Sequence, residues 1–443
     1  MALESVGDLA LHLILDKLDA DDTARVACVC KKLNASASEE TLWSRICSQD
    51  LGLAHPLDHL GNPAPSFKVT YQIWREAFHM YPWSLVKRVK GCWDRIKSWL
   101  STNFPEAAAT LRKGASEADI QELENTLKLK LPLPTRVLYR FYDGQEFTCE
   151  DLSASTAGNS LGLIGGYSFY EHWVNVFLLP ISQVILETQQ IIRHLGFSTR
   201  SKYVVVAASS THSEKLFFLN CTNGQLYVGT RNLPTDGEMI PCVPNALIRS
   251  VHELSGDQQQ DAMLLWLEEH GRRLQNGIIK LSEEENIKSI CLFPEKPPLC
   301  STAVTNGVQV RASAVFIPEL ADPQDDRQKY LFAYSIRMSL QPQGCIINGM
   351  PYSSCQLHWR HWVIRVNDVV ISDANGEAVI GKFPLLRPDE EEFVYQSCTP
   401  LPTSSGSIEG YFDFVPGRLA DPKGSQFQVM VARFPLDLPD YIF

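Results

Sequence analysis

The stretch GDLALHLILDKLDADDTARVACVCKKLNASASEETLWSRI, from Gly7 to Ile46, decides the fold of the N-terminal part of this chain. Apolar residues recur in it at helical spacing, which predicts three short amphipathic helices. So short a segment hides too little of its chain from water to bury these residues alone, so we expect another surface to cover them. Ten of them form the candidate binding surface: Leu9, Leu13, Ile14, Leu18, Val26, Val29, Cys30, Leu33, Leu42 and Trp43.

The order of these residues resembles the F-box, the motif with which substrate receptors bind the Skp adaptor of cullin-type ubiquitin ligases. Two positions depart from the family pattern, since Gly7 replaces the proline at its entry and Leu33 replaces the tryptophan of its second helix. The resemblance implies that the ten residues contact the Skp adaptor and reach the cullin through it. It rests on three blocks: Ile14-Leu15-Asp16-Lys17-Leu18, Val29-Cys30-Lys31-Lys32-Leu33 and Leu42-Trp43.

The composition is typical of a soluble globular protein with several domains. The chain has 443 residues, 44% of them hydrophobic, and a net charge of -11. This balance argues against a protein that follows nucleic-acid phosphates, which needs a basic excess. The basic stretch from Lys87 to Lys97 is therefore interpreted as a solvated helix face. No segment has the length of a membrane span or the pattern of a signal peptide, so we expect no membrane partner and a location in the nucleus or cytoplasm.

The candidate metal-binding and catalytic motifs of the sequence lack the spacing or the flanking elements that such sites need. The twelve cysteines are expected to be free thiols, and without Cys-x-x-Cys spacing we expect no metal and no cofactor. Cys355, His358 and His361 on one strand would be too far apart, and on alternate faces, for one ion. The sequence from Gly158 to Gly162 matches Gly-x-Ser-x-Gly but lacks the flanking strand and helix of a hydrolase. The acidic run 389–392 is interpreted as solvated, so we expect no catalytic residue and no enzyme.

The centre of the chain predicts an α+β domain. Residues 1–50 are assigned to the F-box and residues 51–110 to a helical connector. In residues 111–279, Ser116 is a candidate N-cap, Leu131-Pro132 ends a helix, and Asp143-Gly144 turns the chain. This order resembles the SUKH (Smi/Knr) domain, which implies that strands follow. Asn223-Gly224 between apolar runs predicts a hairpin.

The last part of the chain predicts a β-sandwich. Residues 280–300 combine charges and prolines, which indicates a linker. Beyond them, in residues 301–443, apolar and polar residues alternate, as from Phe332 to Leu340, so each strand is expected to bury one face. The sequence of residues 301–443 resembles the ApaG domain, which implies an all-β immunoglobulin-like sandwich. The stretch from Gly376 to Gly381 lacks the middle glycine of a phosphate-binding loop, so no such site is expected. The resemblance rests on Trp362-Val363-Ile364, Val379-Ile380-Gly381-Lys382-Phe383-Pro384-Leu385-Leu386 and Thr403-Ser404-Ser405-Gly406-Ser407-Ile408-Glu409-Gly410-Tyr411.

The three-part order resembles eukaryotic F-box proteins with an ApaG tail. It implies a non-catalytic subunit of a Skp-cullin-F-box ubiquitin ligase that presents an unknown protein substrate for ubiquitination and proteasomal degradation. Two alternatives stay open. One is an enzyme or ligand-binding protein that uses a cleft in the middle domain, with the SUKH and ApaG parts binding a small molecule or a partner independently of a ligase. Alternatively, the chain could be a scaffold whose N-terminal helices pack inward, which would bury Leu9, Ile14, Val29 and Leu33.

Overall fold

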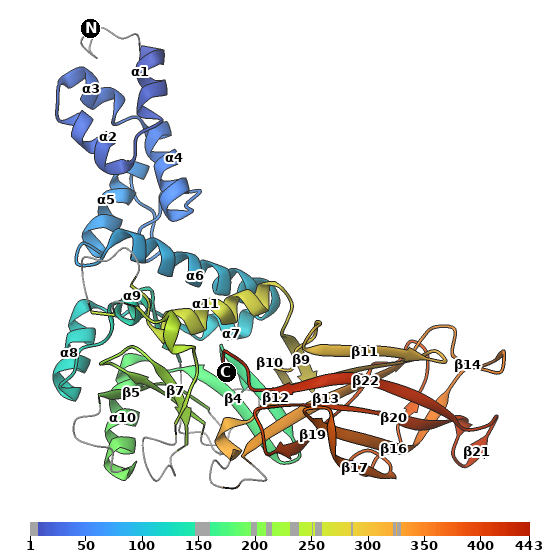
Figure 1. Ribbon diagram of the computed structural model, residues 1–443. Coiled ribbons are helices and arrows are strands. Elements are labelled where there is room, and N and C mark those ends of the chain that lie inside the picture. The colour runs from blue at the N-terminus through green and yellow to red at the C-terminus, as the bar shows by residue number, and fades with distance from the viewer. Residues whose placement is uncertain are drawn as a thin grey trace.

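Three parts follow one another along the chain in the computed structural model (Figure 1). A helical N-terminal segment projects from the body, a mixed middle part contains a curled sheet, and the C-terminal part is made of strands. None of the described helices is long and apolar enough to cross a membrane. The structure describes residues 8–146, 160–195, 202–209, 215–230, 239–249, 251–252, 259–284, 287–321, 325 and 329–443, so Gly7 lies outside the described residues.

Local capping sets the boundaries of the N-terminal helices. Asp19 accepts a hydrogen bond from the backbone N–H of Asp22 at the start of the second helix. Gly52, with a φ of 64°, ends the fourth, because glycine adopts this left-handed conformation without steric cost. The buried indole of Trp43 donates to the Ala37 carbonyl at 2.7 Å. The helices are α1 (Asp8–Leu15), α2 (Ala20–Ala27), α3 (Lys31–Ser36), α4 (Glu40–Leu51) and α5 (Phe67–Ala77).

The expected connector packs firmly on the middle part. Trp74 of α5 stacks on Phe78 with ring centroids 5.8 Å apart, and Phe78 stacks on Phe141 at 5.0 Å. Arg88 binds Glu268 at 2.7 Å and so joins two long helices that lie side by side in Figure 1. The projecting segment is therefore attached to the body through aromatic packing and an ion pair. The helices concerned are α6 (Trp83–Asn103), α7 (Pro105–Ala109) and α11 (Ala262–Gln275).

An eight-stranded sheet of order β8-β7-β6-β5-β4-β3-β10-β9 organises the middle part. The predicted hairpin at Asn223-Gly224 is confirmed, since it joins the antiparallel strands β6 and β7. The predicted N-cap is confirmed as well, because Ser116 Oγ accepts from the Asp119 N–H at 3.1 Å. The elements are β1 (Leu111–Lys113), α8 (Glu117–Leu127), α9 (Leu133–Phe141), β2 (Tyr142–Gln145), β3 (Gly165–Phe169), β4 (His172–Leu178), α10 (Ile181–Leu195), β5 (Tyr203–Ser209), β6 (Leu216–Asn220), β7 (Leu226–Gly229), β8 (Ile240–Pro241), β9 (Lys280–Glu284) and β10 (Ile287–Cys291).

The expectation of a linker over residues 280–300 is wrong for its first half. Strands β9 and β10 pair antiparallel, and Cys291 pairs with Gly166 of β3, so this stretch extends the middle sheet. Ile290 is buried, whereas Glu283 and Lys288 are exposed. The charged residues therefore occupy the solvated face at the edge of the sheet, which is why the charge run resembled a linker.

The two larger sheets of the C-terminal part pack face to face, and a separate two-stranded sheet accompanies them. Tyr334 of β13 lies 6.0 Å from the Trp362 ring of β16 and 6.3 Å from the Phe434 ring of β22. The four-stranded sheet has the order β11-β12-β13-β19, and the second sheet has β16 and β20 at its centre. The strands are β11 (Cys300–Thr305), β12 (Val308–Phe316), β13 (Tyr330–Leu340), β14 (Cys345–Ile347), β15 (Met350–Tyr352), β16 (Cys355–Val366), β17 (Val369–Glu377), β18 (Leu385–Leu386), β19 (Phe393–Leu401), β20 (Ser405–Arg418), β21 (Asp421–Pro422) and β22 (Phe427–Asp437).

The expectation that the strand from Phe332 to Leu340 buries one face is wrong. Ser335 and Arg337 on its second face are buried as well. Glu295, from the segment before β11, reaches this face and accepts hydrogen bonds from Arg337 Nη1 and, at 2.5 Å, from Arg311 Nη1. Polar residues in this strand are therefore paired within the protein and are not solvated.

Candidate docking surface on the N-terminal helices

Helix α1 carries apolar side chains on two faces. Leu11 and Leu15, four residues apart, point inward and are buried. Leu9, Leu13 and Ile14 are 78%, 59% and 44% exposed. The prediction named the outward residues and missed the inward pair, because Leu9 and Leu13 have the same four-residue spacing as Leu11 and Leu15. One face of the helix thus holds the segment together, and the other is free to contact another molecule.

A fourth exposed apolar residue lies close to the start of α1. Val29, between α2 and α3, is 68% exposed. Lys32 Nζ lies 3.3 Å from Asp8 Oδ1, which brings the start of α3 next to the start of α1. Leu9 follows Asp8 in the sequence, and Val29 lies shortly before Lys32. Both residues are therefore near the same end of the projecting segment. We call the exposed residues Leu9, Leu13, Ile14 and Val29 the outer set.

The other six predicted residues divide into two groups. Leu33, Leu42 and Trp43 are buried in the core of the segment itself, so they support the surface from beneath. Leu18, Val26 and Cys30 are half-buried and pack against that core. The scaffold alternative required Leu9, Ile14, Val29 and Leu33 to be buried, and only Leu33 is.

Charged groups near the outer set pair with one another. His12 Nδ1 lies 3.0 Å from Glu39 Oε2, and Arg45 Nε lies 3.5 Å from Asp16 Oδ1. In the core beneath, burial raises the pKa of the Cys47 thiol to about 12, so it packs as a neutral hydrophobe. With these charges paired, the outer set is the feature of the segment that a partner would bury.

Two further motifs from the sequence lie at Ser160 and on the strand that contains Cys355 and His361. Ser160 is buried, and Gly158 and Asn159 lie outside the described residues. Cys355 is buried, while His361 Nε2 contacts Asp373 Oδ1 at 2.6 Å. Across the described ranges, no three His, Cys, Asp or Glu side chains are grouped so that they could hold a metal.

The acidic run and the basic stretch are both engaged in ion pairs. Glu392 binds Arg311 at 2.5 Å. In the basic stretch, Lys87 and Lys90 bind Asp50 and Asp94 at 3.2 and 2.6 Å. Charged side chains of both runs are thus paired within the protein.

Comparison with known proteins gives matches at both ends and over the whole chain. The F-box-like family profile matches residues 10–49, and the ApaG domain profile matches residues 321–416. The chain is 62% identical to F-box protein SKIP16 of Arabidopsis thaliana, over 100% of both chains. It is 24% identical to F-box only protein 3 of Homo sapiens, over 100% of this chain and 84% of that protein. A solved structure of the putative ApaA protein from Bordetella pertussis is 29% identical, covers 32% of this chain and 98% of its own, and has a TM-score of 0.25.

Proposed function

Because this chain belongs to the family of F-box proteins with a C-terminal ApaG domain, we propose that it is the substrate-recognition subunit of a Skp-cullin-F-box ubiquitin ligase. The outer set binds the Skp adaptor, and the adaptor links the chain to the cullin. The middle part, which we assign to the SUKH type, and the ApaG domain hold the substrate protein. The chain itself makes and breaks no bonds, and the substrate is ubiquitinated and degraded by the proteasome.

The observation that carries the proposal is the exposure of the outer set on a segment that projects from the body (Figure 1). Four large apolar side chains at one end of a helical segment are costly in water and favour a partner surface. The capping and core residues beneath them keep the helices folded, so the surface is present before the partner arrives. Such preorganisation lowers the cost of binding.

The free energy from burying the outer set can be compared with the cost of association. A fully buried Leu, Ile or Val contributes about 1.5 to 3 kcal/mol, so the four residues contribute on the order of 6 to 12 kcal/mol. Association costs about 4 to 15 kcal/mol. The first range lies inside the second, so the four residues alone leave little net binding energy, and the half-buried Leu18, Val26 and Cys30 must add to the contact. Loss of any one large residue of the outer set should then weaken binding measurably.

The mechanism is positional. Trp74, Phe78 and Phe141 attach the helical segment to the middle part through stacked rings. A substrate bound to the body is thereby held at a fixed distance from the adaptor, which raises the local concentration of its lysines at the ubiquitin-charged enzyme. A rigid attachment serves this mechanism better than a flexible one.

Pull-down of the full chain with purified Skp adaptor tests the proposal. Leu9→Glu/Leu13→Glu places two charges in the outer set and is expected to abolish recovery of the adaptor. The matched control is Val369→Glu/Ile371→Glu, which places the same charges on two exposed apolar residues of β17 in the C-terminal part. Equal recovery of the adaptor by both variants would remove the docking claim.

A further inference from the structure

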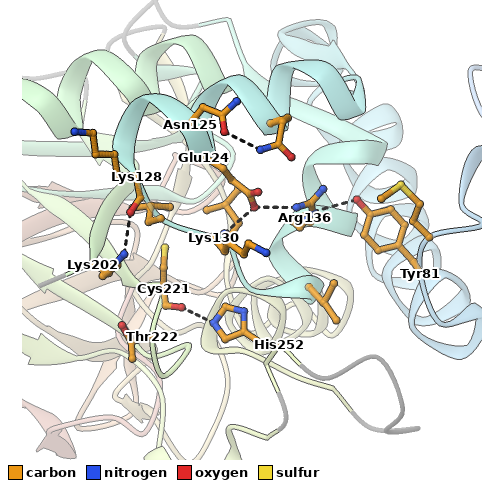
Figure 2. A pocket seen from close by; sticks show the side chains of 15 residues that line it. Tyr81, Glu124, Asn125, Lys128, Lys130, Arg136, Lys202, Cys221, Thr222 and His252 are labelled. Atoms are coloured by element: carbon orange, nitrogen blue, oxygen red, sulfur yellow. Dashed lines mark hydrogen bonds and ion pairs between the residues drawn. The ribbon is translucent and has the colours of Figure 1, made fainter. Parts of the chain in front are cut away.

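An open cavity of about 950 Å³ lies in the middle part, away from the outer set (Figure 2). Its walls come from α8, the turn that leads into α9, the loop before α6, and the turn after β6. This volume is at the upper end of the roughly 300 to 1,000 Å³ of ligand pockets. It can therefore accept several linked groups, as in a segment of peptide.

Three lysines, Lys128, Lys130 and Lys202, line this cavity and give it a positive charge. Lys202 Nζ donates a hydrogen bond to the Lys128 carbonyl at 2.8 Å. In the part of the chain that the structure describes, no carboxylate pairs with any of the three lysines. On a chain whose net charge is -11, this cluster is a local excess of positive charge that favours an acidic ligand.

The acid and the arginine in the cavity wall already neutralise each other. Glu124 Oε1 accepts from Arg136 Nη1 at 2.9 Å and from the Leu131 N–H at 2.9 Å. Arg136 Nη2 also binds Glu117 at 2.9 Å. Figure 2 shows Arg136 between Glu124 and Tyr81, with Lys128 and Lys202 on the other side of Glu124. The charges left for a ligand are therefore the three ammonium groups.

The chemistry of these groups distinguishes between acidic ligands. Phosphoryl groups are recognised best by the planar fork of arginine, which binds two oxygens at once, and the fork of Arg136 is occupied. Lysine ammoniums are compact point charges without this fork, and three of them on separate residues can each pair with one carboxylate along a chain. Met80 is exposed and Leu133 is half-buried in the same wall, so an apolar side chain between the carboxylates also finds a contact.

We propose that this cavity binds an acidic peptide segment of the substrate protein, with Asp or Glu carboxylates on Lys128, Lys130 and Lys202 and an apolar side chain against Met80 and Leu133. The inference rests on the proposed function, because it names the substrate feature that the receptor recognises. It requires no phosphorylation of the substrate.

Fluorescence anisotropy with the full chain tests the site. The probe is a labelled peptide, Glu-Glu-Leu-Glu-Glu-Leu-Glu, and its control has glutamine at every glutamate. We expect the glutamate peptide to bind, and its affinity to fall as salt rises from about 0.05 to about 0.5 M because salt screens the charges. We expect the glutamine peptide to bind at least about tenfold more weakly. Equal binding of the two peptides, or no binding of the glutamate peptide, would overturn the proposal.

Two charge-reversal variants place the binding in this cavity. Lys130→Glu/Lys202→Glu is expected to lower the affinity for the glutamate peptide at least about tenfold. Lys113→Glu/Lys329→Glu changes the net charge by the same amount at two exposed lysines outside the cavity and is expected to have less than about a twofold effect. Equal affinities of the two variants would contradict the assignment. A phosphoserine peptide that binds more than about tenfold tighter than the glutamate peptide would contradict the choice of carboxylate.

Adaptor pull-down with the same variants separates this site from the docking claim. The lysines lie outside the N-terminal helices, so Lys130→Glu/Lys202→Glu is expected to recover the Skp adaptor as well as the parent chain does. This result also shows that the N-terminal helices of the variant are folded. Failure of adaptor binding in the parent chain would count against the proposed function, whereas failure of the peptide experiment alone would count only against this site.

Discussion

Lys215 Nζ lies 3.7 Å from Glu319 Oε2, and this buried ion pair joins the middle part to the C-terminal part. Tyr167 and His172 also contact Glu319, at 2.7 and 2.9 Å. Burial opposes ionisation of Glu319, but Lys215, His172 and Tyr167 together hold the pKa of its carboxyl below the usual value. Lys215 also donates to the Phe443 carbonyl at 2.5 Å. The two parts are therefore held together by charges that water does not reach.

Removal of one partner of this pair should destabilise the protein strongly. Lys215→Met leaves the Glu319 carboxylate buried without its main counter-charge, and we expect a loss of about 3 to 5 kcal/mol in the free energy of unfolding. Lys215→Met/Glu319→Gln should cost less than the sum of the two single variants, because no unpaired charge remains. Urea unfolding followed by tryptophan fluorescence measures both. Single variants as stable as the parent chain would show that the pair does not hold the two parts together.

The two faces of α1 should respond oppositely to truncation. Leu11→Ala removes a buried side chain and is expected to lower the free energy of unfolding by about 2 to 5 kcal/mol. Leu13→Ala is on the exposed face and should change stability by less than about 0.5 kcal/mol, yet it should weaken adaptor binding. Thermal unfolding and adaptor titration of the same two proteins give the comparison. Loss of stability in Leu13→Ala would mean that the outer set is already covered by the chain itself.

His270 should make the protein sensitive to acid. The imidazole is fully buried, its Nε2 contacts the Leu163 carbonyl at 2.8 Å, and burial lowers its pKa from 6.5 to about 4. The unfolded chain binds this proton below about pH 6.5 while the folded chain does not, so stability falls as the pH drops from about 6.5 to about 4. The contribution of this one group is about 3 kcal/mol. His270→Gln should remove this part of the acid sensitivity.

Asp261 also changes the stability over this pH range. The difference in the free energy of unfolding between the parent chain and His270→Gln isolates the contribution of His270 from that of Asp261. Burial raises the pKa of the Asp261 carboxyl to about 6. Its contribution has the opposite sign, because the folded chain binds that proton more readily than the unfolded chain and gains stability as the pH falls through 6. Urea unfolding at a series of pH values measures both proteins. Parallel profiles between pH 6.5 and 4 would show that His270 takes up its proton in the folded state.

Sequence reasoning predicted three helices between Gly7 and Ile46 where the structure has four, α1 to α4, and it did not give the orientation of the first one. In DLALHLIL, leucine or isoleucine stands at five of the eight positions of α1, so hydrophobic periodicity does not choose between the Leu9–Leu13 face and the Leu11–Leu15 face. The orientation depends on contacts with α3, which lies later in the sequence. The helix cap at Ser116 and the turn at Asn223-Gly224, by contrast, could be predicted from the sequence. Each depends only on residues that are a few positions apart.

Long-range pairing explains the remaining differences. The charge run before Ile290 belongs to a sheet because β10 pairs with β3, and the buried Arg337 pairs with Glu295, which is 42 residues away in the sequence. Lys128 and Lys202 are 74 residues apart in the sequence, so no local pattern indicates that they line one cavity. Features that depend on distant segments carried no signal in the sequence.

The measurement that tests the central claim most directly is amide hydrogen exchange of the full chain with and without purified Skp adaptor. Exchange of backbone amides slows where binding suppresses local opening. The account predicts that the adaptor slows exchange in α1, α2 and α3, around Leu9, Leu13, Ile14 and Val29, and leaves the C-terminal sheets unchanged. Unchanged exchange in these three helices at a saturating adaptor concentration, or slowing confined to the C-terminal sheets, would contradict it.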